Sequence, residues 1–184
     1  GQAMWRLTCA RGGTGTRPFI VGDLPEFIET ESNSLPELAE RVELPVTING
    51  RIAGESDLDY FMFHAAAGEV VIIDVVAARL GSPFDPVVEI SDTMGRRIAA
   101  EEFHVGSDPV LAFRAPTSGD YRLLVSNVSF HGSPAHVYRV TLTTVTLADS
   151  TASSLRAELL DRGLVPSLGA VTLAGGVARP ESAK

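Results

Sequence analysis

Five side chains that could supply oxygen ligands stand at alternating positions in two short segments. Glu29, Glu31 and Asn33 occupy every second position of the first segment, and Asp57 and Asp59 do so at the start of an expected strand. Calcium takes six to eight oxygen ligands, mainly carboxylates and carbonyls. The five residues are therefore candidate calcium ligands. The alternative is that they are solvated acids of a linker and turn residues beside a strand.

Other acids and the histidines give weaker signals. A second acidic group falls in expected loops that could gather at one end of a domain, but Asp-Pro at 85–86 and 108–109 is more typical of a turn. No histidine pair has zinc-site spacing, and no serine lies in a nucleophile elbow. We therefore expect no catalytic centre. The acids are Asp85, Asp92, Glu101, Glu102 and Asp108, and the histidines are His64, His104, His131 and His136.

The charge balance is acidic, with 23 Asp and Glu against 15 Lys and Arg, a net charge of -8 and a pI near 4.9. This charge opposes binding to nucleic acid or to an anionic membrane. No apolar run approaches the ~18 residues of a membrane span. The single cysteine, Cys9, excludes an intrachain disulfide and a cysteine-based zinc site, and we expect it to be a small buried side chain.

The elements that must position these residues are short strands. From Pro45 onward, apolar runs alternate with Gly, Pro, Asp and Ser clusters, which predicts an all-β, antiparallel β-sandwich of jelly-roll type with about eight strands. The run Val70–Val76 is apolar on both faces except for Asp74, which needs a partner or a place at an edge. The expected strands are Val46–Ile52, Leu58–His64, Glu69–Ala77, Val87–Ser91, Arg96–Ala99, Val110–Arg114, Tyr121–Ser126 and Val137–Leu147.

Four regions are expected along the chain. Residues 1–21 resemble the last hairpin of a preceding unit, and residues 22–44 form an acidic linker with one helical turn capped by Ser34. Residues 45–148 form the sandwich. Residues 149–184 hold a short helix, ended by Gly163, and a flexible tail. Because the chain starts without Met inside an expected strand, we expect a fragment whose export signal lies upstream.

Five landmarks occur in order between residues 57 and 142. They are Asp57-Leu58-Asp59-Tyr60-Phe61-Met62-Phe63, Ala67-Gly68-Glu69, Gly81-Ser82-Pro83-Phe84-Asp85-Pro86, Asp92-Thr93-Met94-Gly95 and Ser118-Gly119-Asp120-Tyr121-Arg122-Leu123. In this order they resemble the bacterial pre-peptidase C-terminal domain family. The segment Phe27–Asn33 is similar to the E-x-E-x-N stretch that precedes this domain. The leading hairpin and linker are similar to those of large exported proteins of planctomycete-type bacteria.

This resemblance implies a non-catalytic accessory module of a secreted multidomain bacterial protein, which assists secretion, stability or attachment. Its partners would be neighbouring domains of the same polypeptide, and its location secreted, cell-surface or periplasmic. In collagen-binding relatives a comparable linker and strand start hold calcium. The resemblance therefore implies Glu31, Asn33 and Asp59 as ligands, with Glu29 and Asp57 as further candidates. Ser34 departs from the pattern, because an Asp more often follows the Asn.

The alternative function is binding of extracellular polysaccharide or a protein fibre, with calcium as a possible stabiliser. Aromatic side chains that are not assigned to the core would form the contact surface. These are Trp5, Tyr60, Phe84, Phe103 and Phe130. Turn chemistry accounts for Gly68, Gly95 and Gly119 without any function, and Tyr121 is a candidate tyrosine corner.

Overall fold

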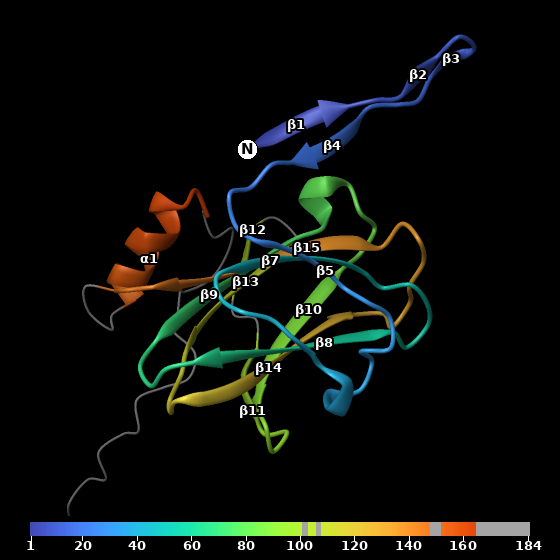
Figure 1. Ribbon diagram of the computed structural model, residues 1–184. Helices are drawn as coiled ribbons and strands as arrows, with labels where there is room; N and C mark the ends of the chain where they lie inside the picture. The colour runs from blue at the N-terminus through green and yellow to red at the C-terminus, as the bar shows by residue number, and fades with distance from the viewer. Residues whose placement is uncertain (101–102, 106–107, 148–151, 165–184) are drawn as a thin grey trace, which may run out of the picture.

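Two sheets packed face to face form the body of the protein, as the computed structural model shows for residues 1–100, 103–105, 108–147 and 152–164 (Figure 1). The first sheet has the order β11-β10-β14-β8-β6 and the second β12-β13-β9-β15-β7-β5. The first consists of β11 (Arg97–Ala100), β10 (Pro86–Asp92), β14 (Gly119–Asn127), β8 (Leu58–Ala65) and β6 (Glu40–Arg41). The second consists of β12 (Phe103–Val105), β13 (Asp108–Arg114), β9 (Val70–Val76), β15 (Val137–Val145), β7 (Val46–Arg51) and β5 (Glu26–Ile28).

The expected β-sandwich is confirmed, and each of the eight expected strands corresponds to an observed one. Within the described part of the sandwich, three short strands were not expected, namely β5, β6 and β12. Two of these come from the linker, and both pair in parallel: β5 with β7, and β6 with β8. The linker therefore adds an edge strand to each layer instead of only docking beside the domain.

The core lies between the layers and follows the alternation of the sequence. Phe61 and Phe63 of β8 are fully buried, as are Leu123 of β14 and Val140 of β15. Phe113 and Tyr121 pack ring to ring with centroids 4.8 Å apart. The tyrosine corner is confirmed, because the Tyr121 hydroxyl donates a hydrogen bond to the Thr117 carbonyl at 2.5 Å.

The outer face of the second sheet is partly covered by the short helix α1 (Ala152–Asp161), which lies against β9 and β13. Leu155 and Leu159 of the helix pack on Ile72 and Val110. This second cover explains why β9 is apolar on both faces. No helix among the described residues is long and apolar enough to span a membrane.

Asp74, the one acid in β9, pairs with Arg79, which lies in the short 3-10 helix η2 (Ala78–Leu80). Its carboxylate lies 2.5 Å from Arg79 Nη2, and the same guanidinium contacts Asp108 at 2.8 Å. Asp108 is fully buried and also accepts the backbone N–H groups of Ala78 and Arg79. The expected role of Asp108 as a simple turn residue is thus replaced by a buried network.

Three local expectations need correction or refinement. Gly68 and Gly95 have positive φ, as the turns require, but Gly119 is the first residue of β14, pairs with Ala65 and has no such conformation. The helical turn is η1 (Pro36–Leu38), and no side chain caps it, because Ser34 Oγ donates to Asp57 instead. The helix end is as expected, since Gly163 has a φ of 73°.

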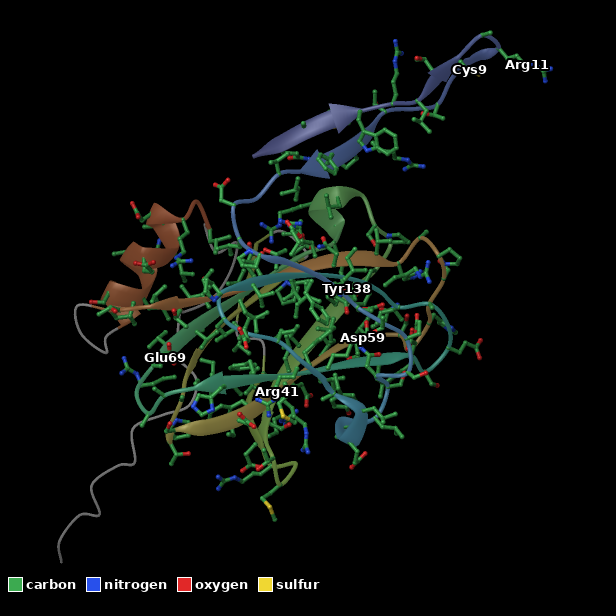
Figure 2. The ribbon with its side chains drawn as sticks, in the orientation of Figure 1. Cys9, Arg11, Arg41, Asp59, Glu69 and Tyr138 are labelled. Carbon is green, nitrogen blue, oxygen red and sulfur yellow. The ribbon has the colours of Figure 1, made fainter. Side chains whose placement is uncertain are left out.

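Residues 1–21 form a ribbon that extends away from the sandwich (Figure 1). Strand β1 (Gln2–Trp5) pairs with β4 (Arg17–Ile20), and β2 (Thr8–Cys9) pairs with β3 (Gly12–Gly13) at the far end. Cys9 and Arg11 lie at this tip (Figure 2). Cys9 is exposed, so the prediction of a buried cysteine is wrong, because the ribbon has no layer to bury it.

Candidate functional site

The first part of the linker, β5, is bound to the edge of the second sheet by strand pairing with β7 and by an ion pair. Phe27 of β5 lies opposite Ile48 of β7. Its ring packs edge-on against Phe61, with ring centroids 6.4 Å apart. Arg139 of β15 holds both oxygens of Glu26 at 2.7 and 2.9 Å. This pair is bidentate and partly buried, which favours a defined geometry. The Arg139 contact holds the pKa of Glu26 below its ordinary value.

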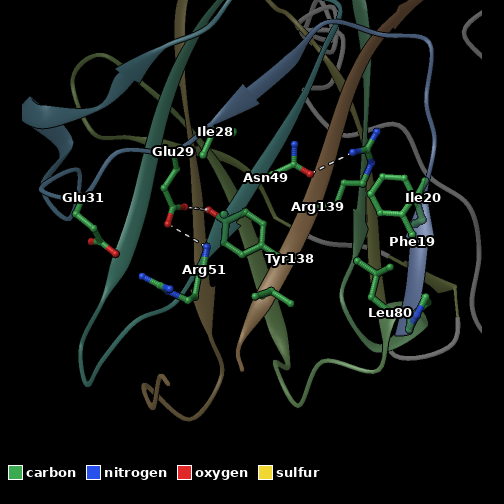
Figure 3. A pocket seen from close by; sticks show the side chains of 13 residues that line it. Phe19, Ile20, Ile28, Glu29, Glu31, Asn49, Arg51, Leu80, Tyr138 and Arg139 are labelled. Carbon is green, nitrogen blue, oxygen red and sulfur yellow. Dashed lines mark hydrogen bonds between the residues drawn. The ribbon is translucent and has the colours of Figure 1, made fainter. Parts of the chain in front are cut away.

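The absence of a side chain at Gly50 lets the carboxyl group of Glu29 enter the sandwich. Gly50 of β7 lies opposite Tyr138 of β15, on the inner face. A Cβ atom at this position would overlap both the Glu29 carboxylate and the Tyr138 ring. Only glycine leaves this slot open. Through it Glu29 reaches Tyr138, while its other oxygen accepts the Arg51 backbone N–H at 2.9 Å (Figure 3).

Two carboxyl groups converge on one phenolic hydroxyl inside the sandwich. The Tyr138 oxygen lies 2.7 Å from Glu29 Oε2 and 2.6 Å from Asp59 Oδ2. A tyrosine hydroxyl has a single proton to donate. One carboxyl group accepts this proton, so the other must itself be protonated and donate to the phenolic oxygen. The geometry therefore holds an extra proton or an equivalent positive charge.

Burial accounts for the electrostatics of this group. Desolvation raises the pKa of Asp59 to about 9, and the nearby Glu29 carboxylate adds to the rise. Desolvation also raises the pKa of Glu29, although the hydrogen bond from Tyr138 opposes it. The fully buried Tyr138 has a pKa well above its ordinary value for the same reason. Burial therefore favours the protonated, neutral form of Asp59.

Buried polar atoms of Asp59 and Asn33 lack hydrogen-bond partners among the described residues. They are Asp59 Oδ1 and both side-chain polar atoms of Asn33. Asn33 is 1% exposed, and its backbone carbonyl accepts the Tyr60 N–H, which places it next to the start of β8. Unsatisfied buried oxygens are costly unless a water or an ion meets them. Glu29, Asn33 and Asp59 thus offer the kind of oxygens that a hard cation takes.

The remaining two candidate ligands lie differently. Glu31 is exposed, and Figure 3 shows its side chain apart from that of Glu29. Both oxygens of Asp57 are already used, one by Ser34 Oγ at 3.0 Å and the other by the Ala53 N–H at 2.6 Å. Within the described ranges, no three His, Cys, Asp or Glu side chains gather as a metal site would require. A cation here would depend on two carboxylates and an amide.

The second acidic group is dispersed. Asp92 accepts the N–H groups of Met94 and Arg96 within its own turn, as an Asx turn does, and Asp108 is in the Arg79 network. Glu101 and Glu102 lie outside the described residues. The aromatic side chains proposed as a contact surface are also separated from one another. Phe84 is buried against Tyr138, whereas Trp5 is exposed on the ribbon and Phe130 on a loop after β14.

The sequence interpretation missed Tyr138 and Gly50 as parts of this group. Tyr138 alternates with Val140 and Leu142, so it was indistinguishable from an ordinary core residue. A signal was nevertheless present in Gly50. A glycine inside an expected strand often marks a close approach of another group.

A 72-residue stretch is 33% identical to a probable subtilase-type serine protease of Deinococcus radiodurans, and it makes up 39% of this chain and 10% of that protease. The match thus spans about a tenth of the protease. It gives no support to a planctomycete-type source. No family model matches the chain.

Several solved structures show similarity at low identity. The pre-peptidase C-terminal domain of a Bacillus anthracis collagenase is 20% identical, with 58% of this chain and 94% of that chain covered, at a TM-score of 0.43. The periplasmic g-type lysozyme inhibitor of Aeromonas hydrophila is 13% identical, with 65% and 99% covered, at a TM-score of 0.44. The inhibitor from Salmonella Typhimurium is 17% identical, with 58% and 100% covered, at 0.42.

Proposed function

We propose that this chain is a non-catalytic accessory β-sandwich module of a secreted multidomain bacterial protein, located outside the cytoplasm. The observation that carries the proposal is the two-layer sandwich that retains the five sequence landmarks, together with a stretch similar to a small part of a subtilase-type protease. The module assists the secretion, stability or attachment of the larger protein. Its immediate partners are neighbouring domains of that polypeptide.

The proposal assigns no catalytic role to the polar side chains of the described residues. Among the described residues, a serine–histidine contact joins Ser133 Oγ and His136 Nδ1 at 2.7 Å. The same hydroxyl accepts the Ala135 N–H, which is the pattern of a local turn. A serine nucleophile needs a base that a third group orients. No carboxylate hydrogen bond to His136 is recorded in the part of the chain that the structure describes.

The test uses the full polypeptide and this chain side by side. The isolated chain should hydrolyse neither peptide nor glycoside substrates. In the full polypeptide, Phe113→Asp should disrupt the sandwich and reduce the amount of exported protein, while the kcat/KM of the protein that is exported stays unchanged. Phe130→Asp, at an exposed loop position, is the matched control. Hydrolysis by the isolated chain that vanishes in Ser133→Ala would contradict the proposal.

A calcium-stabilised linker is the second candidate, and the unpartnered oxygens of Asn33 and Asp59 favour it. Glu29, Asn33 and Asp59 would hold the ion, and the ion would take the place of the proton that the Tyr138 geometry needs. Its role would be structural, because calcium would tie the linker to the strand start of β8. Glu31 and Asp57 remain predicted ligands only if their side chains rearrange.

Calcium titration followed by thermal unfolding tests this candidate. Millimolar calcium should raise the Tm, and Asn33→Leu should abolish the rise because it removes an amide oxygen without adding charge. Glu37→Gln changes an exposed acid of the same linker and should leave the rise intact. A melting curve that calcium leaves unchanged removes the candidate. Polysaccharide or fibre binding stays a prediction, since no described aromatic platform supports it.

A further inference from the structure

The ribbon of residues 1–21 exposes apolar side chains that its own chain does not cover. Trp5 is 47% exposed, Phe19 54% and Met4 61%. An isolated two-stranded hairpin is at best marginally stable in water. Large uncovered apolar groups on a protruding element mark an interaction surface. Trp5 is also the only tryptophan of the chain.

Both faces of the ribbon carry such side chains. The register sets Trp5, Arg17, Ala3 and Phe19 on one face, and it sets Met4, Pro18, Gln2 and Ile20 on the other. Ile20 and Pro18 are half-buried beside Leu80 at the base, where the ribbon meets the sandwich. On the opposite face Phe19 lines the same pocket at the base, yet it stays 54% exposed, and Trp5 further along the ribbon is 47% exposed. A strand pair that is apolar on both faces is typical of the interior of a layered sheet.

The edges of the ribbon are open as well. In the two-stranded sheet β1–β4 each strand has one neighbour, so the outer edge of each presents backbone N–H and C=O groups. Open edges of this kind template pairing with further strands. A partner that supplies strands would satisfy the edges and cover the apolar faces at once.

The charge of the ribbon specifies the partner further. Residues 1–21 hold Arg6, Arg11 and Arg17 and no acid, so all 23 Asp and Glu residues lie in the remainder of the chain. Pairing of two ribbons would bring six arginines together without a carboxylate, which like-charge repulsion opposes. The partner sheet should therefore have acidic residues around its apolar layer.

A second copy of the described sandwich is a poor receptor for the ribbon. Exposed Ile28 and Val137 line a pocket that Phe19 and Ile20 of the same chain's ribbon already line. Other large exposed apolar side chains, such as Met94 in a turn and Leu160 on α1, lie on separate elements. The two ends of the ribbon meet beside the sandwich, where Gly1 and Val21 are hydrogen-bonded, and its long axis points outward (Figure 1). A unit that includes the ribbon would stand end to end with the sandwich.

We propose that the ribbon is the last strand pair of a preceding β-sheet domain in the same polypeptide, which has an apolar interior and an acidic rim. This inference rests on the proposed role as a module of a multidomain protein. A tethered partner is present at high effective concentration, so a small interface suffices. The junction then joins two sandwiches through one continuous chain, with the Gly22–Pro25 stretch as the hinge between them.

Hydrogen exchange tests this in the full polypeptide and in residues 1–184 alone. The amides of β1 and β4 should exchange at least about 100-fold more slowly in the full polypeptide, because strand pairing protects them. Peptides from β8 and β14 should show equal protection in both, as the internal reference. In the full polypeptide Phe19→Asp should lower the protection of β1 and β4, whereas Phe130→Asp should not.

Three results would overturn the inference. The first is equally fast exchange of the ribbon in both proteins. The second is protection in residues 1–184 alone that grows with protein concentration, which would assign the surface to a second copy. The third is a polypeptide with no residues ahead of Gly1. None of these results bears on hydrolysis or export, so the ribbon proposal and the proposed accessory role fail separately.

Discussion

The ribbon and the sandwich are built from the same kind of strand but differ in what covers them. Phe19 on β4 is 54% exposed, whereas Phe113 on β13 is fully buried between two sheets. Both lie in paired strands with alternating side chains. Strand pairing is thus common to both regions, and a second layer exists in only one. The stability of this chain should therefore come from layer contact, since burial of apolar surface is the main driving force of folding.

The largest difference is expected from matched phenylalanine substitutions in the two regions. Phe113→Ala should lower the free energy of unfolding by about 3–5 kcal/mol, because it leaves a cavity in a closed core. Phe19→Ala in residues 1–184 should change it by less than about 0.5 kcal/mol, because the side chain is already solvated. Urea denaturation of the two variants measures both values. Equal losses would show that the ribbon is part of the same cooperative unit.

Charged side chains in the sandwich and on the ribbon should differ in the same way as the phenylalanines, and Asp108 in its buried network is the example. Asp108→Ala should cost about 3 kcal/mol, because it leaves the Arg79 guanidinium and two backbone N–H groups without their acceptor. Arg6→Ala on the ribbon is the contrasting change, and the unfolding midpoint should not move. A small loss in Asp108→Ala would mean that water replaces the carboxylate.

The pH dependence of the free energy of unfolding should arise from buried groups of the sandwich, chiefly Asp59, and not from the ribbon. The pKa of Asp59 is raised in the folded state to about 9, so between its unfolded value and that pKa the folded protein binds a proton that the unfolded chain has lost. Stability therefore falls as the pH rises from 5 to 9, by at most about 1.4 kcal/mol per unit from this group. Asp59→Asn should flatten the slope when unfolding is measured with a calcium chelator. An unchanged slope would mean that another group binds the proton.

The smallest effect is expected at the tyrosine corner. Tyr121→Phe removes the hydrogen bond to the Thr117 carbonyl while the ring packing remains. The loss should be about 1 kcal/mol. Thermal unfolding of the variant measures it, with Tyr60→Phe on the partly exposed face of β8 as the control. A loss several times larger would show that the ring itself has moved.

Sequence periodicity was sufficient for the sandwich strands and insufficient for how the linker is used. Phe61, Phe63 and Leu123 face inward as alternation predicts, because one face of each strand must leave water. Three-residue β5 and two-residue β6 are too short to show any period, and their parallel pairing depends on contacts distant in sequence. Local patterns contain no information about such contacts.

The candidate site was predictable only in part for the same reason. The sequence identified Glu29, Asn33 and Asp59 as chemically notable, and the structure places Glu29 and Asp59 on one hydroxyl. The role of Tyr138 depends on the slot at Gly50, which forms only when β7 and β15 pair. Cys9 was misjudged because small apolar residues are usually buried, whereas the ribbon has no interior.

The double use of the linker has a practical consequence for anyone who transplants this module into another protein. A version that begins at Pro45, where the regular strands begin, would lack β5 and β6. Strands β7 and β8 would then be exposed edge strands of their sheets. It would also discard Glu29 and Glu26, so the Tyr138 hydroxyl would lose one of its two carboxyl partners and Arg139 would lose its ion pair. The portable unit starts at Gly22, upstream of where the repeating strand pattern begins.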